Sequence, residues 1–157
     1  MKAISLWQPW ATLWVLQIKK YETRSWPFPY WHTGPVAIHA AKKEYGKLLD
    51  IKEQWFDLVN QQLYEAGFDF FELPKGALIG FCDGIISTPI KERPKNKMEE
   101  MFGDWSPGRY QWASRNMRAI KEPIPFKGRQ GLFDIDNNIL VDGQRDQPKR
   151  HRQLKLF

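Results

Sequence analysis

Short apolar stretches between proline and glycine corners restrict the fold of this 157-residue chain more than any other feature. Most of these stretches are too short for long helices, and several alternate apolar and polar residues as strands do. We therefore expect an α+β fold, a small mixed β-barrel with helices packed outside it. The expected strands are residues 3–6, 20–26, 36–40, 77–86, 109–113 and a last strand within 124–135.

Two stretches carry apolar residues at helical spacing. Residues 9–18 form a short helix that begins at Pro9, a residue favoured at the first helical position. Residues 45–66 form a longer amphipathic helix that stops at Gly67. Between the later strands, residues 87–108 are rich in Pro, Lys, Glu and Gly, which indicates a surface insertion with one helical turn around 98–102.

The length fits one domain with a real core. The net charge is +6, of which residues 145–157 carry +4, so we expect a domain over 1–142 and a flexible basic tail over 143–157. The single cysteine, Cys82, excludes a disulfide framework and indicates a reducing compartment. We expect neither a signal peptide nor a membrane span, and a cytoplasmic protein.

The stretch from Ile18 to Trp26 is unusual for a core strand. Alternation places Glu22, Arg24 and Trp26 on one face, with Lys19 at the entry turn. Glu22 supplies a hydrogen-bond acceptor, Arg24 a rigid fork of donors and Trp26 a plane for stacking. This combination would suit a polar, planar ligand. A strand with an ordinary Glu–Arg pair beside a half-buried Trp explains the same pattern, so both interpretations stay open.

Three segments together resemble the ASCH domain of the PUA-like superfamily, in the version found in activating signal cointegrator proteins and their bacterial and phage homologues. They are Ile4–Ala11, Ile18–Trp26 and Ile38–Ala41, and residues 77–80 and 125–133 match later strands of that pattern. The family motif is Gly-x-Lys-x-x-Glu-x-Arg. Here Gln17 replaces the Gly, while Lys19, Glu22 and Arg24 are present.

The resemblance implies a PUA-like barrel with a cleft beside the early helix, and an association with nucleic acids or modified bases. Such readers need an aromatic wall and donors directed at base edges. Residues expected around the cleft are Trp7, Gln8, Pro9, Lys19, Glu22, Arg24, Ser25 and Trp26. Residues expected at its rim or floor are His39, Tyr110, Arg115, Lys127 and Arg129.

An enzymatic alternative also comes from the resemblance. Some small ASCH proteins are amidohydrolases that remove an acyl group from modified cytidine, with the motif Lys as a catalytic residue. Here Lys19 would be the nucleophile or base and Glu22 the proton carrier, although those enzymes have Thr in the place of Glu22. Asp83 is only a loose match to their acidic residue.

Other chemistry-bearing residues give weaker signals. The three histidines have no spacing typical of a metal site, so we expect no metal and no cofactor. Neither Ser5 nor Ser25 lies in a Gly-x-Ser-x-Gly elbow, which argues against a serine hydrolase. The loop Gly128–Gly131 could bind phosphate through backbone N–H groups or could be a simple corner.

The last five residues resemble the pentapeptide by which bacterial replication and repair proteins dock on the DNA sliding clamp. Gln153, Leu154, Leu156 and Phe157 match it, and Lys155 departs from it. Apolar side chains on a basic linker suit docking on a partner, and a terminal strand on the domain is the alternative. The match favours DNA over RNA and a bacterial or phage source.

Together these observations predict a nucleic-acid-associated domain. Its cleft would recognise a base or modified nucleotide, and the clamp would bring it to DNA. Hydrolysis of an N-acylated cytidine through Lys19 is the alternative, and the sequence gives no information on the oligomeric state.

Overall fold

The computed structural model describes residues 1–43 and 53–139. The first part of the expected long helix, residues 45–52, lies outside the described residues. The tail, 143–157, lies outside them too, with its clamp-like pentapeptide and the boundary expected near 142.

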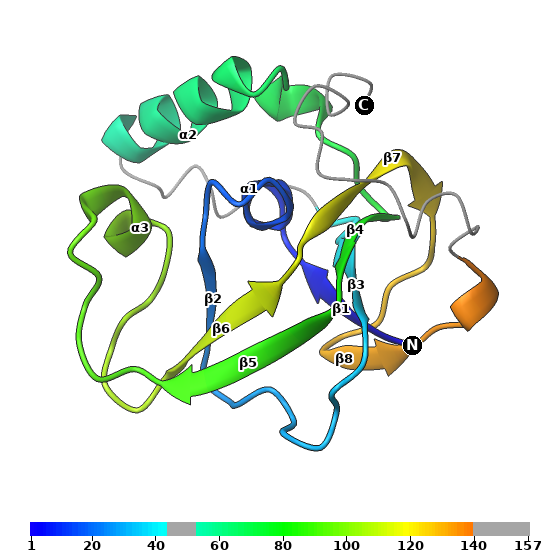
Figure 1. Ribbon diagram of the computed structural model, residues 1–157. Helices are drawn as coiled ribbons and strands as arrows, with labels where there is room; N and C mark the ends of the chain where they lie inside the picture. Colours follow the sequence, from blue (N-terminus) through cyan, green and yellow to red (C-terminus); the bar gives the residue numbers. More distant parts are fainter. Residues whose placement is uncertain (44–52, 140–157) are drawn as a thin grey trace.

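The chain folds into short strands and few helices (Figure 1). The strands are β1 (Lys2–Leu6), β2 (Tyr21–Arg24), β3 (Val36–Ala40), β4 (Ala77–Cys82), β5 (Gly84–Pro89), β6 (Tyr110–Arg115), β7 (Arg118–Pro125) and β8 (Leu132–Asp134). The α-helices are α1 (Trp10–Val15), α2 (Glu53–Glu65) and α3 (Lys97–Met101), and 3-10 turns η2 and η3 cover Phe70–Glu72 and Asn137–Ile139.

The strands form two sheets. The larger has the order β7-β4-β3-β1-β8 and the smaller has the order β2-β6-β5. Strands β1 and β3 pair in parallel, because the chain passes through α1 and β2 before it returns beside β1, and the other pairings are antiparallel. The predicted α+β class is confirmed, but the described strands make two sheets rather than one closed barrel.

Two strand predictions were wrong in detail. The apolar run expected as one strand over 77–86 is broken at Asp83, where the chain leaves β4 in the larger sheet and enters β5 in the smaller one. Both halves begin with buried residues, so hydrophobicity alone does not mark the break. Strand β7 was not predicted, because its sequence mixes charged residues with two prolines.

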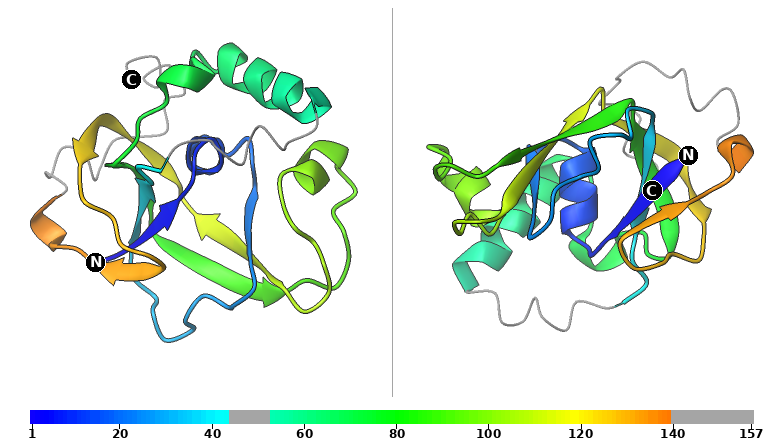
Figure 2. Two further views of the ribbon diagram at one scale, coloured as in Figure 1. Left: turned by 180° about the vertical axis from the view of Figure 1, so that it is seen from behind. Right: turned by 90° about the horizontal axis from the view of Figure 1, so that it is seen from below.

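Helix α1 lies between the two sheets (Figure 2). Its buried Trp14 and Val15 share one core cluster with Ile38 of the larger sheet and Trp112 of the smaller sheet. Gly80 of β4 permits this packing, since a Cβ there would lie 2.6 Å from a methyl carbon of Val15. The opposite side of α1 packs on α2 through Leu13, Leu16, Val59 and Leu63.

The segment expected as a surface insertion, residues 87–108, is partly buried. It contains the predicted helical turn, α3, and buries Phe102 and Trp105. The carboxylate of Glu99, only 5% exposed, accepts hydrogen bonds from the backbone N–H groups of Lys20 at 2.8 Å and Tyr21 at 3.0 Å. The insertion therefore fixes the beginning of β2. Within the described ranges, no helix has the length and apolar character needed to cross a membrane.

Candidate functional site

A cleft of about 1030 Å³ opens where several elements of the larger sheet end. It lies at the carboxyl ends of β1 and β3, the beginning of β4 and the loop between β7 and β8, and β2 contributes Arg24. The lining residues are Ser5, Trp7, Arg24, His39, Ala41, Lys42, Lys43, Lys75, Gly76, Phe126, Lys127, Gly128, Arg129, Gln130 and Gly131.

The charged side chains of this lining have a single sign. Six of its residues are basic, and none of the described residues that line it is acidic. Because like charges in one concave site raise the local positive potential, this arrangement attracts an anionic ligand. Trp7, which is 43% exposed, adds an indole to the wall, with the Lys43 Nζ 5.4 Å from the ring centroid.

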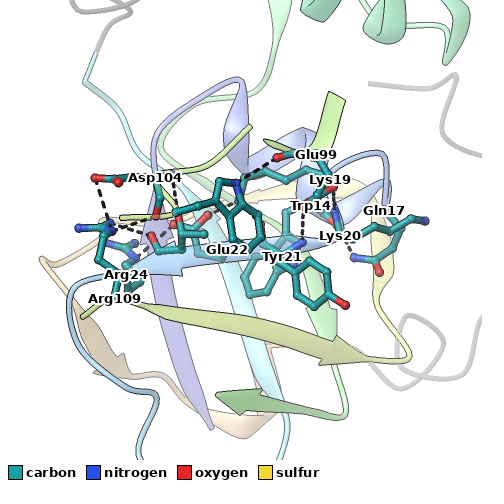
Figure 3. A network of polar contacts seen from close by, with 12 residues as sticks. Trp14, Gln17, Lys19, Lys20, Tyr21, Glu22, Arg24, Glu99, Asp104 and Arg109 are labelled. Atoms are coloured by element: carbon teal, nitrogen blue, oxygen red, sulfur yellow. Dashed lines mark hydrogen bonds and ion pairs between the residues drawn. The ribbon is translucent and has the colours of Figure 1, made fainter. Parts of the chain in front are cut away.

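The family-like motif forms a chain of charges from Lys19 through Glu22 to Arg24 (Figure 3). The Lys19 Nζ lies 2.7 Å from one carboxylate oxygen of Glu22 and also donates to the backbone carbonyl of Tyr21. The other carboxylate oxygen of Glu22 lies 3.2 Å from the Arg24 Nε. Lys19 is only 2% exposed, so its charge is balanced inside the protein rather than presented in the cleft.

Arg24 is the member of this chain of charges that lines the cleft. Its guanidinium carbon lies 6.0 Å from the ring centroid of Trp26 and 5.9 Å from that of Trp112, and its Nη2 donates to the Ser5 carbonyl at 3.4 Å. The ion pair with Glu22 and the two nearby indole rings hold the guanidinium in one orientation. Arg24 is thus a pre-positioned donor at the cleft wall.

Ser5 and His39 face each other across the parallel pair β1 and β3. The Ser5 Oγ lies 2.8 Å from the His39 Nδ1, and the Nε2 of the same ring lies 2.8 Å from the Phe126 carbonyl oxygen. Burial lowers the pKa of His39, and the hydrogen bond to Phe126 opposes this change. The imidazole is therefore neutral near pH 7.

The structure brings only some of the predicted site residues to the cleft. Those that line it are Trp7, Arg24, His39, Lys127 and Arg129. Glu22 acts behind it through Arg24. Lys19 does not line the cleft, and its ammonium group is held by Glu22 and Tyr21. Its position gives no support to hydrolysis through Lys19.

The remaining predicted residues lie elsewhere. Gln8 is buried and supports α1, since its Oε1 accepts from the Thr12 N–H at 3.1 Å and its Nε2 donates to the Pro74 carbonyl at 2.9 Å. Pro9 is buried at the start of α1. Trp26 packs edge-on against Trp112, with ring centroids 4.7 Å apart. Ser25, Tyr110 and Arg115 are also absent from the lining.

Several lining residues were missed from the sequence. Lys42 and Lys43 directly follow β3, and Lys75 precedes β4. The pair Lys42–Lys43 after an expected strand was a usable signal, because β3 carries His39 to the same edge. Lys75 had no such signal, since only the pairing of β3 with β4 brings it there.

Gln17 occupies the motif position where the family has Gly, and its backbone φ is 58°. This left-handed conformation explains a preference for Gly, which adopts it without steric cost. The Gln17 side chain donates to the Trp14 carbonyl at 2.7 Å at the end of α1. The turn therefore forms with Gln17 at this position, and the buried Lys19 follows it.

The chain is similar to two curated proteins along nearly its whole length. It is 26% identical over 152 residues to activating signal cointegrator 1 of Homo sapiens and 26% identical over 155 residues to that of Mus musculus. Each match covers 96% of this chain, which spans a quarter of the length of these relatives. The similarity supports an ASCH domain. No family model matches the chain.

A solved structure is also similar. The crystal structure of ASCH from Zymomonas mobilis has a TM-score of 0.47 and 15% sequence identity, and the match covers 88% of this chain and 89% of that one. In the described part of the chain, no three His, Cys, Asp or Glu side chains are grouped as metal ligands would be.

Proposed function

We propose that this chain is a nucleic-acid-associated ASCH domain whose cleft binds a base or modified nucleotide together with its phosphate. The observation that carries the proposal is the concentration of six basic residues, with no acidic one among the described residues, around a cleft of about 1030 Å³. A cleft of that size accommodates a nucleotide, and its charge suits a phosphate.

The lining offers a separate group for each part of a nucleotide. Arg24 presents a guanidinium fork, suited to a phosphate or to the edge of a base. Trp7 offers an indole face for stacking. Lys127 and Arg129 line the cleft from the loop between β7 and β8, where they suit backbone phosphates.

Nucleic-acid binding by the full-length chain tests this proposal. Single- and double-stranded DNA and RNA are titrated across a salt series with the wild type, Arg24→Ala and Lys127→Ala. We expect each substitution to weaken binding by about tenfold to hundredfold, because a charge-assisted hydrogen bond contributes about 1.5–3 kcal/mol. Loss of Lys127 should also reduce the salt dependence by about one phosphate contact.

Two controls make the result specific to the cleft. Lys121→Ala removes an exposed lysine of β7 that does not line the cleft, so its affinity should match the wild type. Lys149→Ala/Arg150→Ala/Arg152→Ala removes tail charge and separates the contribution of the tail. Affinity that depends on the tail substitutions alone, and not on Arg24 or Lys127, would refute the cleft as the binding site.

We propose further that residues 143–157 are a basic linker that ends in a sliding-clamp-binding segment. The support is the sequence pattern Gln153-Leu154-Lys155-Leu156-Phe157 behind a polar, basic stretch. A tethered segment of this kind raises the local concentration of the domain at DNA without any new contact in the cleft. It favours DNA as the nucleic acid.

Direct binding of the full-length chain to a bacterial sliding clamp tests this second part. Leu156→Ala/Phe157→Ala should abolish measurable binding, because these residues supply the apolar contacts. Lys155→Ala is the matched control, since Lys155 occupies the position that departs from the motif, and it should bind as the wild type does. Equal binding by all three proteins would contradict the assignment.

A further inference from the structure

The Ser5–His39 pair lies at the wall of the cleft, and its hydrogen bonds define which nitrogen carries the proton. A carbonyl oxygen can only accept, so the His39 Nε2 donates to Phe126. The neutral ring then has a lone pair on Nδ1, and the Ser5 hydroxyl donates to it at 2.8 Å. Ser5 thus already directs its proton at a base.

Packing contacts hold the imidazole of His39 in place. His39 is 2% exposed, and its ring contacts Phe126 and Phe133 edge-on. The backbone of Gly128 lies against the same ring, since a Cβ at that residue would be 2.3 Å from the His39 Cε1. These contacts keep the ring facing Ser5. A nucleophile is activated by a base held in this way.

Groups able to stabilise negative charge line the same cleft as Ser5. The Arg24 guanidinium is bound to the Ser5 carbonyl at 3.4 Å. In the part of the cleft lining between β7 and β8, the backbone N–H groups of residues 127–131 donate no hydrogen bond to any described residue. These N–H groups and the guanidinium are donors of the kind that hold an oxyanion in acyl transfer.

We propose that Ser5 is a nucleophile and His39 its general base, for hydrolysis of a carboxylic ester borne by a nucleotide-like anion. The anionic carrier rests on the proposed function of the cleft, whereas the Ser5–His39 chemistry does not. The substrate class follows from the two halves of the site, because a serine–histidine pair attacks acyl carbon and the basic lining holds a phosphate.

The reaction proceeds in two balanced steps. The Ser5 Oγ attacks the ester carbonyl carbon, its proton moves to the His39 Nδ1, and the C–O bond to the carrier breaks as the leaving oxygen takes that proton. Water then attacks the acyl-Ser5 ester, again with the His39 Nδ1 as proton acceptor. Cleavage of that ester returns the proton to the Ser5 Oγ and releases the carboxylic acid. The Phe126 carbonyl accepts from Nε2 throughout and stabilises the imidazolium.

Acylation of the full-length protein by 4-nitrophenyl acetate tests the proposal. We expect a burst of one nitrophenolate per chain, an acetyl group on Ser5 by peptide mass spectrometry, and reaction of Ser5 with a fluorophosphonate probe. Ser5→Ala should remove all three signals. Ser87→Ala, a half-buried strand serine outside the cleft lining, should keep them.

The role of His39 is tested through His39→Gln, which should slow acylation by about 10²-fold or more. Because this buried substitution can also affect folding, Ser5→Cys provides a second measurement with His39 intact. Its thiol should react with iodoacetamide faster than the thiol of Ser25→Cys, because Ser25 is exposed and lies outside the cleft lining. Equal rates, or a burst that survives Ser5→Ala, would overturn the proposal.

The nucleotide-like anion that bears the ester is tested separately. 4-Nitrophenyl acetate has no charge, so its burst reports on Ser5 and His39 even if the cleft binds no nucleic acid. A single-stranded oligonucleotide should slow labelling of Ser5 if the two sites coincide, and undiminished labelling would overturn the nucleotide-like carrier alone. A protein that binds DNA yet never acylates at Ser5 would overturn the nucleophile alone.

Discussion

The ammonium group of Lys19 lies 2.7 Å from the carboxylate of Glu22, and only 2% of Lys19 is exposed. The other oxygen of this carboxylate contacts Arg24, the one member of the three that lines the cleft. The motif therefore works as a support. Lys19 balances the charge of Glu22, Glu22 holds Arg24, and Arg24 lines the cleft.

Lys19→Met should destabilise the protein by about 3 kcal/mol, because it leaves the Glu22 carboxylate without its buried partner. Urea unfolding measures the loss. Lys19→Met/Glu22→Gln should recover part of it, since the double variant no longer holds a carboxylate that has lost its ammonium partner and keeps only Arg24. A loss below about 1 kcal/mol for the single variant would show that the pair behaves as a surface ion pair.

Arg24→Lys should weaken nucleic-acid binding although it keeps the positive charge. A lysine has neither the planar fork nor the face that packs near Trp26 and Trp112, so it is not held by the same contacts. We expect a loss of about tenfold in affinity, measured by fluorescence anisotropy at fixed salt. Affinity equal to the wild type would mean that only the charge of Arg24 matters.

The strand around the motif could be predicted from the sequence because it obeys a local rule. Alternation places Glu22 and Arg24 on one face, and the structure joins them as an ion pair. The core positions of Trp14 and Ile38 follow from the same kind of periodicity. Such patterns depend on neighbours within a few residues, which is what a sequence displays.

The cleft itself could not be predicted, because it depends on pairing between distant segments. Ser5 meets His39 only through the parallel register of β1 and β3, and Lys75 reaches the same edge through β4. The sequence predicted Glu99 in a surface insertion, because no neighbouring residue indicates that its carboxylate accepts hydrogen bonds from the N–H groups of Lys20 and Tyr21. These contacts follow from the topology, which composition and spacing do not determine.

Glu99→Ala should cost about 2 kcal/mol or more, because two backbone N–H groups lose their partner in a buried place. Urea unfolding measures this, and faster amide exchange at Tyr21 should accompany it. The neighbouring Glu100→Ala is the control. Glu100 forms an exposed ion pair with Arg93, so its loss should cost less than about 1 kcal/mol. Equal costs would contradict a capping role for Glu99.

His39 should make the stability of the protein depend on pH in a defined direction. Burial lowers the pKa of folded His39 below its ordinary 6.5, so the unfolded chain binds more protons between these two values. The contribution of His39 is complete above pH 6.5 and is lost as the pH falls through the lowered pKa. The slope from one such group is at most about 1.4 kcal/mol per pH unit.

Urea unfolding of the wild type and two histidine variants between pH 5 and 8 checks this dependence. His39→Gln should flatten the fall in unfolding free energy towards low pH, because glutamine does not titrate. His32→Gln should keep the wild-type slope, since His32 is only half-buried and lies in the loop before β3. A slope that persists in His39→Gln would assign the effect to other groups.

Gly128→Ala should disturb the Ser5–His39 pair without replacing either residue. The added methyl carbon would lie 2.3 Å from the His39 Cε1 and 2.5 Å from its Nδ1. His39 cannot yield cheaply, because Ser5 and Phe126 hold both of its nitrogens. We expect a loss of about 1–3 kcal/mol in unfolding free energy and a smaller burst with 4-nitrophenyl acetate. Gly34→Ala is the control, since its nearest atom would be 3.7 Å away in ordinary contact. If both variants behave alike, the close fit of the loop on His39 is not what holds the pair in place.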